Sequence, residues 1–312
     1  MITSRNPPTY ISFLSTFNTL RIGSVELTKA ACCNLSESFE TSPSVDVSYA
    51  DAVTGIKQIQ LLGLAVNYTQ ITTKNTPEIR GLASIYGLGY VPGPWIEGIQ
   101  VNKATGSVAN GYESIAGQIN VEEIKPDKAN KVFINSYVNE MGRVETTLHR
   151  ARRINDRWST ALLTHADCVA AKSDRNHDGF LDVPTGRQLN VINRWRYAGT
   201  NGLFAHFAIK ALDDQRQAGQ VSFNPSTDKF TTHAYGVGIH AAQYGLSGKL
   251  GYVFPQQKYK SIGFIISGNT YKNDSYYGLT AYNGQQSTVY ATLSSSRSSA
   301  IPTTNTAQAL AS

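Results

Sequence analysis

The sequence predicts two fold classes in succession: a mixed α/β domain, followed by antiparallel strands of a transmembrane β-barrel. Three observations carry this prediction. The 312-residue chain has 16% charged residues, 26 Gly and 17 Tyr, whereas soluble domains average about 25% charged residues. Its second half alternates apolar and polar residues, as strands do when one face meets lipid. The connections between those strands alternate between short and long, which is typical of membrane barrels.

Charge and hydropathy exclude some functional and structural classes of protein. The net charge is +6 and the basic residues are scattered along the chain, so the sequence argues against a nucleic-acid partner. There is no run of 18 apolar residues, so we expect no transmembrane helix. Residues 1–20 have no sustained apolar segment and do not resemble a signal peptide. We therefore expect either a cytoplasmic protein or a chain whose natural N-terminus is missing.

The N-terminal part has the signals of a compact mixed domain over residues 21–127. Residues 1–20 are rich in Ser, Thr and Pro, which indicates a loose leading segment. Ser24 precedes apolar residues at helical spacing and predicts an N-cap followed by a helix over residues 26–39. Short strands are expected at residues 45–47, 57–63 and 66–73. The glycine-rich loop 78–93 is of the kind that carries binding residues.

Three cysteines are present: Cys32 and Cys33 are adjacent, and Cys168 is far along the chain. An odd count at this spacing predicts neither a disulfide framework nor a zinc site. The plainer interpretation is that Cys32 and Cys33 are small apolar residues on the packed face of a helix. The alternative is a thiol pair that relays a metal.

The C-terminal part, residues 128–293, alternates with a period of two residues and predicts about eight strands of a larger barrel. The candidate strands lie at residues 131–139, 144–149, 158–165, 188–197, 203–210, 244–254, 262–266 and 289–293. Short connections are expected at 154–157, 199–202 and 255–260, and longer ones at 170–186, 213–230 and 276–286. The alternation stops at residue 294, so we expect a disordered tail over 294–312.

Aromatic residues provide an independent check on this interpretation. If the first strand starts at the periplasmic side, five aromatic residues fall at the periplasmic ends of the apolar strand faces: Trp158, Trp195, Tyr197, Tyr252 and Phe254. Such residues would form part of an interfacial girdle. The alternative, a soluble β-sandwich, also has alternating strands but does not predict aromatic residues at one end only.

The stretch from Pro94 to Val121 reads as two short strands around a glycine-rich turn. It has no Cys, His or metal-ligand spacing, so it does not look like a catalytic centre. Its spaced residues are Ile96, Glu97, Ile99, Val101, Lys103, Gly106, Ser107, Gly111, Gly117 and Asn120. On these positions the chain resembles the plug domain of TonB-dependent outer-membrane receptors, over about residues 20–126. It departs from that pattern at Ala104, where a glycine is usual.

This resemblance implies a receptor or transporter in the bacterial outer membrane, in contact with the lipid bilayer and lipopolysaccharide. The plug would occlude a pore, and the inner-membrane TonB complex would supply the energy for uptake of a scarce small-molecule ligand. Family members take up several kinds of ligand, of which a ferric siderophore or another metal chelate is the first expectation. Since no bond in the ligand is broken, we expect no catalytic residues, no enzyme activity and no required cofactor.

The loop before the motif contains the expected ligand contacts: Arg80, Tyr86 and Tyr90. Arginine suits an anionic chelate, and tyrosine can stack on it or form hydrogen bonds. The alternative is that Tyr86 and Tyr90 simply pack against the barrel wall.

The number of strands conflicts with a complete receptor. Large plugged transporters close about 22 strands, whereas the interior of a barrel of about eight is filled by its own side chains. An open sheet would also leave two unpaired edges in lipid. We therefore expect the chain to be a fragment of a longer receptor.

One connection resembles a calcium loop. Asp174, Asn176, Asp178 and Asp182 stand at positions 1, 3, 5 and 9 of such a loop. Thr185 replaces the bidentate glutamate at position 12, and no flanking helices are expected. Bound Ca²⁺ therefore competes with a plain loop tip held by hydrogen bonds from Asx side chains.

Two other functional classes remain open. A surface adhesion or binding module that does not transport is the second choice. An enzyme is the third, because His149, His165 and His206 have no nucleophile and carboxylate at a recognisable motif. Cys32, Cys33, His165 and His177 would suit a soft metal such as copper, but no two of them have ligand spacing.

Overall fold

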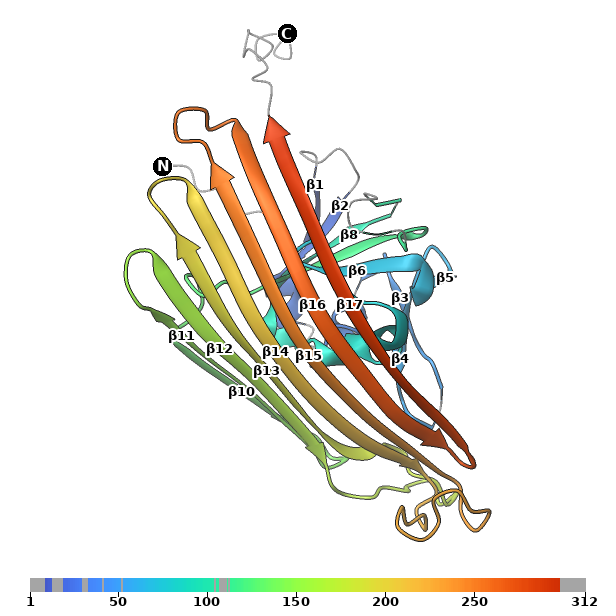
Figure 1. Ribbon diagram of the computed structural model, residues 1–312. Helices are drawn as coiled ribbons and strands as arrows, with labels where there is room; N and C mark the ends of the chain where they lie inside the picture. Colours follow the sequence, from blue (N-terminus) through green and yellow to red (C-terminus); the bar gives the residue numbers. More distant parts are fainter. Residues whose placement is uncertain are drawn as a thin grey trace, which may run out of the picture.

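The computed structural model describes residues 9–12, 19–29, 33–40, 42–51, 53–103, 105–106, 111 and 113–297. The described chain contains a large curved sheet and a smaller N-terminal part that lies on one face of it (Figure 1). We call the large sheet the wall, and the described residues up to 123 the N-terminal unit. Among the described residues, no helix is both long and apolar enough to cross a bilayer.

The wall has eight strands, each antiparallel to its neighbours in chain order. They are β10 (Val132–Val138), β11 (Arg143–Arg153), β12 (Trp158–Val169), β13 (Thr185–Ala198), β14 (Leu203–Gly219), β15 (Gly236–Val253), β16 (Lys260–Tyr277) and β17 (Thr280–Arg297). The predicted strand count is confirmed. In the described chain β10 and β17 do not pair with each other, so the sheet is open.

The two faces of the wall differ as the alternation predicts. Ile209, Leu246 and Phe264 point away from the N-terminal unit and are 46%, 56% and 40% exposed. Side chains on the opposite face are buried although many are polar; His165 is 3% exposed and Asn190 is fully buried. An apolar exposed face and a polar covered face are the arrangement of a barrel wall in lipid.

The expected aromatic cluster forms at the short-turn end of the wall. Trp158 lies opposite Tyr197 in the register, with ring centroids 5.0 Å apart. Trp195 is 6.4 Å from Trp158, and Tyr252 and Phe254 form a second pair at 5.0 Å. The turns at this end are residues 154–157, 199–202 and 254–259, and the long connections 170–184 and 220–235 lie at the other end (Figure 1).

Four predicted boundaries in the wall are wrong. The expected long connection at 213–230 begins only after β14 ends at Gly219, and the strand expected at 244–254 already begins at Gly236. The expected connection at 276–286 is a tight turn in which Gly278 has φ 57°. The expected tail from residue 294 starts inside β17, which continues to Arg297, and residues 298–312 lie outside the described part. In each case ladder hydrogen bonds extend a strand whose outward residues are no longer apolar.

The N-terminal unit is built on a six-stranded sheet in the order β1-β2-β8-β9-β6-β7. Its strands are β1 (Thr9–Ser12), β2 (Thr19–Gly23), β6 (Thr69–Thr73), β7 (Thr76–Ile79), β8 (Ile96–Asn102) and β9 (Gly117–Glu123), and a second sheet contains β3 (Asp46–Tyr49), β4 (Lys57–Leu61) and β5 (Leu64–Ala65). Ile99, Val101, Ile119 and Val121 from β8 and β9 are at most 1% exposed and form the centre of its core. The predicted hairpin is therefore the central pair of this unit.

The helix predicted over residues 26–39 is wrong in length. The unit has one short helix, α1 (Ser24–Lys29), and a separate 3₁₀ turn, η1 (Glu37–Phe39). Asn34 explains the break, because it forms a β-bridge with Pro92 and its side chain accepts hydrogen bonds from the backbone of Ser36 and Glu37 at 3.0 and 3.3 Å. The remaining 3₁₀ turns are η2 (Val66–Tyr68), η3 (Gly81–Ser84), η4 (Gly87–Tyr90) and η5 (Gly93–Trp95).

The motif residues occupy structural positions in this unit. Gly117 starts β9 where a Cβ atom would lie 2.2 Å from the carbonyl oxygen of Asn102, so only glycine fits. The side chain of Asn120 accepts hydrogen bonds from Asn75 N and Thr72 Oγ1 at 2.7 and 2.9 Å. Ile96 and Glu97 open β8, Lys103 is exposed just after it, and Gly106 and Gly111 lie in the turn region, whereas Ser107 and Ala104 are outside the described residues.

Candidate functional site

The N-terminal unit packs against the polar face of the wall, and we call their contact the seam. Two apolar clusters span it. Tyr90 packs with Leu212 and Ile239 of the wall, and Trp95 packs with Leu163 and Ile192. Since these side chains are at most 4% exposed, buried apolar contacts join the two parts at two places.

Charges across the seam follow a pattern in which the wall supplies the cations. Arg194 forms an ion pair with Glu123, and Lys210 Nζ lies 2.5 Å from Glu78 Oε1. Lys249 also donates to a backbone carbonyl of the N-terminal unit, that of Lys74. The acceptors on the N-terminal unit therefore match a row of cations on β13, β14 and β15.

The seam opens into a polar cavity of about 310 Å³ toward the end of the wall that has the long connections. We call it the outer cavity. The residues that carry its chemistry are Glu37, Lys57, Tyr86, Tyr90, Arg143, Asp167, Asp214 and Arg216. Both parts of the chain contribute cations, anions and hydroxyl groups, so neither sign of charge dominates the lining of the cavity. The cavity can therefore bind a polar ligand that carries charge.

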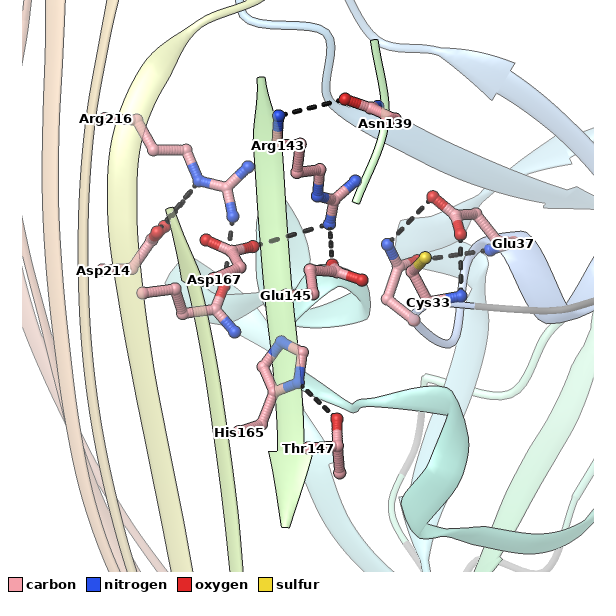
Figure 2. A network of polar contacts seen from close by, with 12 residues as sticks. Cys33, Glu37, Asn139, Arg143, Glu145, Thr147, His165, Asp167, Asp214 and Arg216 are labelled. Atoms are coloured by element: carbon pink, nitrogen blue, oxygen red, sulfur yellow. Dashed lines mark hydrogen bonds and ion pairs between the residues drawn. The ribbon is translucent and has the colours of Figure 1, made fainter. Parts of the chain in front are cut away.

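A network of ion pairs holds the wall side of this cavity (Figure 2). Arg143 on β11 pairs with Glu145 on the same strand and lies 3.5 Å from Asp167 on β12. On β14, Arg216 Nε lies 2.9 Å from Asp214 Oδ1. These partners stand two residues apart on one strand or diagonally across β11 and β12, on one face of the sheet, so regular strand geometry brings them together.

Two of the three predicted ligand contacts, Tyr86 and Tyr90, line this cavity. Both are buried, as expected if they pack against the wall. Tyr90 is 2% exposed; its hydroxyl donates to Asp214 Oδ2 at 3.1 Å, and its carbonyl oxygen accepts from Asn190 Nδ2 at 2.6 Å. Burial, followed by the nearby Asp214 carboxylate, raises the pKa of the Tyr90 phenol well above its usual value. Tyr86 is 7% exposed and its hydroxyl lies 2.7 Å from that of Tyr277.

The structure does not bring Arg80 to the same place. Its guanidinium pairs with Glu113 and lines another cleft, of about 610 Å³, together with Asn67 and Gln286. Contact of Arg80, Tyr86 or Tyr90 with a ligand stays a prediction.

The predicted calcium loop forms a compact tip between β12 and β13. Asp174 accepts hydrogen bonds from the backbone of Asp178 and Gly179 at 3.2 and 3.1 Å, and Asp182 accepts one from Arg175 N at 2.8 Å. Gly179 has φ 85°, and the side chain of Asn176 donates to Asp178 at 2.8 Å. These bonds are those of an Asx-rich tip, and Ca²⁺ binding there stays a prediction.

The cysteines occupy two different environments. Cys33 lies near the seam, and burial, then the nearby Glu145, raises the pKa of its thiol, so the thiol is protonated at neutral pH. Cys168 is free and exposed on the outward face of β12. Cys32 lies outside the described residues.

Sequence reasoning did not find the wall side of the site. Arg143, Glu145, Asp167, Asp214 and Arg216 are charged residues that the strands carry on their covered face. One local signal was available, since charged residues two apart share a strand face. Which strands then meet the N-terminal unit depends on the fold of the whole chain.

Comparison with known proteins identifies the fold. No protein-family model matches the sequence, and no curated protein matches it. Among solved structures, the closed form of the ferric-catecholate import receptor Fiu from E. coli aligns with a TM-score of 0.64 at 11% identity, over 90% of this chain and 42% of that one. The siderophore receptor PiuA from Acinetobacter baumannii aligns with a TM-score of 0.62 at 11% identity, over 84% of this chain and 37% of that one.

The copper transporter OprC is a further neighbour, with a TM-score of 0.56 at 11% identity, over 88% of this chain and 49% of that one. These neighbours are TonB-dependent siderophore and metal receptors. The chain therefore has the fold of part of such a receptor: a smaller unit packed on an open wall of antiparallel strands. It spans less than half the length of each of these three structures.

Proposed function

We propose that this chain is part of a TonB-dependent receptor that carries a metal chelate across the bacterial outer membrane. In this proposal residues 21–127 form the plug, and residues 128–293 form part of the barrel around it. The observation that carries the proposal is the outer cavity, which lies between the two parts and is lined by polar residues from both. A ligand bound there touches the plug and the barrel at once.

The seam gives this arrangement a physical basis for gated uptake. The N-terminal unit is held by a few ion pairs and two apolar clusters on the wall. Ligand contacts that shift Tyr86 or Tyr90 would reach the wall through Tyr277 and Asp214. The inner-membrane TonB complex would then supply the force that displaces the plug. The ligand crosses unchanged, so the residues bind and orient it and perform no covalent step.

The neighbours' names support a metal chelate as the ligand class, since they include receptors named for ferric catecholates, for siderophores and for copper. Ferric chelates of this kind are commonly anionic, and Lys57 and Arg143 place cations on opposite sides of the outer cavity. Lys57 is already paired with the exposed Glu40 at 2.5 Å and with the half-buried Glu37 at 3.6 Å, so a ligand would compete with both carboxylates.

The test measures retention of a radio-iron-labelled catecholate chelate by outer-membrane vesicles that contain the chain. We expect Lys57→Gln to weaken retention roughly tenfold, because a hydrogen bond to a charged group contributes about 1.5–3 kcal/mol. The matched control is Lys258→Gln, which changes an exposed lysine in the turn at the opposite end of the wall.

Three results would contradict the proposal. The first is a folded chain that fractionates with soluble protein. The second is a chain in the outer membrane that retains no chelate, which would favour the adhesion alternative. The third is equal weakening by both lysine variants, which would remove the outer cavity as the binding place.

A further inference from the structure

One cluster on the wall has the composition of a metal site. It contains Glu145 on β11 and His165 and Asp167 on β12, and one ligand atom from each residue lies within 4.8 Å of the others. Glu145 and His165 are 5% and 3% exposed. The register places Glu145 opposite Asp167, and His165 is two residues away on the same face, so all three point into the seam (Figure 2).

The ligand set suits a divalent first-row transition metal. An imidazole nitrogen with two carboxylate oxygens is a borderline donor set, which binds Zn²⁺ and its neighbours and is less suited to Mg²⁺ or Ca²⁺. Bonds of 2.0–2.2 Å in a tetrahedral site place ligand atoms roughly 3.3 Å apart. The three side chains would therefore draw together by about 1.5 Å at most, which carboxylate rotation can supply.

A hydrogen bond already orients the histidine. Thr147 Oγ1 lies 2.9 Å from His165 Nδ1, which leaves the other ring nitrogen for an ion. Hydrogen bonds of this kind to the second nitrogen are the usual companions of metal-binding histidines. Both residues stand on paired strands, so the geometry is held by the sheet.

His149 provides a second, independent observation. It follows Thr147 by two residues on the same face of β11 and is 5% exposed, stacked on Phe133 at 4.7 Å. Neither of its ring nitrogens has a hydrogen-bond partner among the described residues. An unpaired buried imidazole is costly. His149 lines a cleft of about 530 Å³ together with Glu145 and Thr147, and we call this the inner cleft.

Arg143 is the cation that now balances the cluster, because it pairs with both Glu145 and Asp167. An ion that binds the same carboxylates must displace its guanidinium. Arg143 and a metal ion would therefore compete for the same two carboxylates. This competition would keep metal binding reversible.

We propose that Glu145, His165 and Asp167 bind a divalent transition-metal ion at the seam, and that His149, outside this cluster, offers a separate imidazole on the side of the inner cleft. Asp167 also lines the outer cavity, whereas Glu145 and His149 line the inner cleft. The residues thus connect the two spaces along β11 and β12. This inference rests on the proposed function and deepens it, since it places a divalent-metal site between the two spaces of the proposed receptor.

The test consists of two separate calorimetric titrations of the purified full chain in detergent, one with Zn²⁺ alone and one with Mg²⁺ alone. We expect one Zn²⁺ site per chain and no comparable heat from Mg²⁺. His165→Gln should weaken Zn²⁺ binding at least about tenfold. The matched control is His240→Gln, which removes a histidine paired with Asp213 at 2.9 Å on the outward face of the wall and should leave the affinity unchanged.

Arg143→Gln separates a metal site from a purely structural network. If the ion competes with Arg143, this variant binds Zn²⁺ more tightly than the unaltered chain, and Zn²⁺ restores the thermal stability that the variant loses. A network with no metal role predicts loss of stability that Zn²⁺ does not restore.

Two outcomes would overturn the inference: no Zn²⁺ binding by a chain whose circular dichroism shows folded strands, or equal binding by His165→Gln and the unaltered chain. The titration involves no transport. Loss of chelate retention with Zn²⁺ binding intact would therefore overturn only the proposed function, and the reverse result only the metal site.

Discussion

Lys74 is a lysine whose neighbours include the cations Arg194 and Lys249. It lies in the turn between β6 and β7, where its φ is 52°, and its carbonyl oxygen accepts a hydrogen bond from Lys249. Burial, followed by the charge of Arg194, lowers the pKa of Lys74 from 10.5 to about 6, against a smaller opposing effect of Glu122. At neutral pH the side chain is therefore neutral in the folded protein and charged in the unfolded chain, so it opposes folding.

The sign of the resulting pH dependence follows from proton binding. Between pH 6 and 10.5 the unfolded chain holds a proton on Lys74 that the folded protein lacks, so stability rises with pH through this range. We expect Lys74→Met to raise the melting temperature at pH 6–7 by at least about 1.5 °C, the shift that roughly 1 kcal/mol gives in a chain of this size. The gain should vanish above pH 10.5. A gain of the same size at every pH, or an equal gain from the exposed Lys103→Met control, would disprove this account.

At the scale of elements, a buried ion pair joins the end of β9 to the wall. Glu123 and Arg194 have side chains 5% and 8% exposed, and Arg194 Nη1 also donates to the carbonyl oxygen of Ile124 at 3.3 Å. Desolvation makes such a pair a weak net stabiliser, but removal of one partner leaves a buried charge unbalanced. The ion pair therefore fixes where β9 lies on the wall, because Glu123 must meet Arg194.

The buried ion pair predicts that substitutions of its two residues are strongly non-additive. Arg194→Met alone should cost about 3–5 kcal/mol, and Arg194→Met combined with Glu123→Leu should recover most of that loss because no charge stays buried. Trp95 lies in the adjoining apolar cluster, so its fluorescence in a Trp158→Phe, Trp195→Phe background can follow the undocking of the unit during denaturation. The exposed pair Arg175 and Glu140, 3.0 Å apart, is the control and should couple by less than about 1 kcal/mol. Additive losses at the buried pair would contradict the docking role.

The strands also show which parts of the fold could be predicted from the sequence. Alternation predicted all eight wall strands, because lipid on one side imposes a period of two. It failed at the ends of β14, β16 and β17, where the outward residues become polar and no apolar signal remains. The site was only half predictable. Tyr86 and Tyr90 are in a recognisable loop, but the partners of Tyr90 are Asn190 and Asp214, which lie 100 and 124 residues away and are brought close only by strand register.

At the scale of the whole molecule, the length of the strands exceeds what a bilayer needs. A transmembrane strand takes about 9–11 residues, whereas β14 has 17 and β15 has 18. On β14 the outward residues are apolar from Leu203 to Ala211 and become polar from Asp213 onward. The wall therefore has an apolar band next to the short turns and a polar extension toward the long connections, which is also where the outer cavity opens.

The three tryptophans can test this placement, because the chain has only Trp95, Trp158 and Trp195. Trp158 and Trp195 are 41% and 36% exposed at the short-turn edge of the apolar band, whereas Trp95 is 1% exposed inside the seam. In vesicles with brominated acyl chains we expect strong quenching of the first two, and more from bromines near the headgroups than from bromines near the midplane, since aromatic girdles lie at the interface. The variant with Trp158→Phe and Trp195→Phe should be almost unquenched. Strong quenching of Trp95 in that variant would mean that lipid reaches the seam, and the N-terminal unit could not then fill the inside of a barrel.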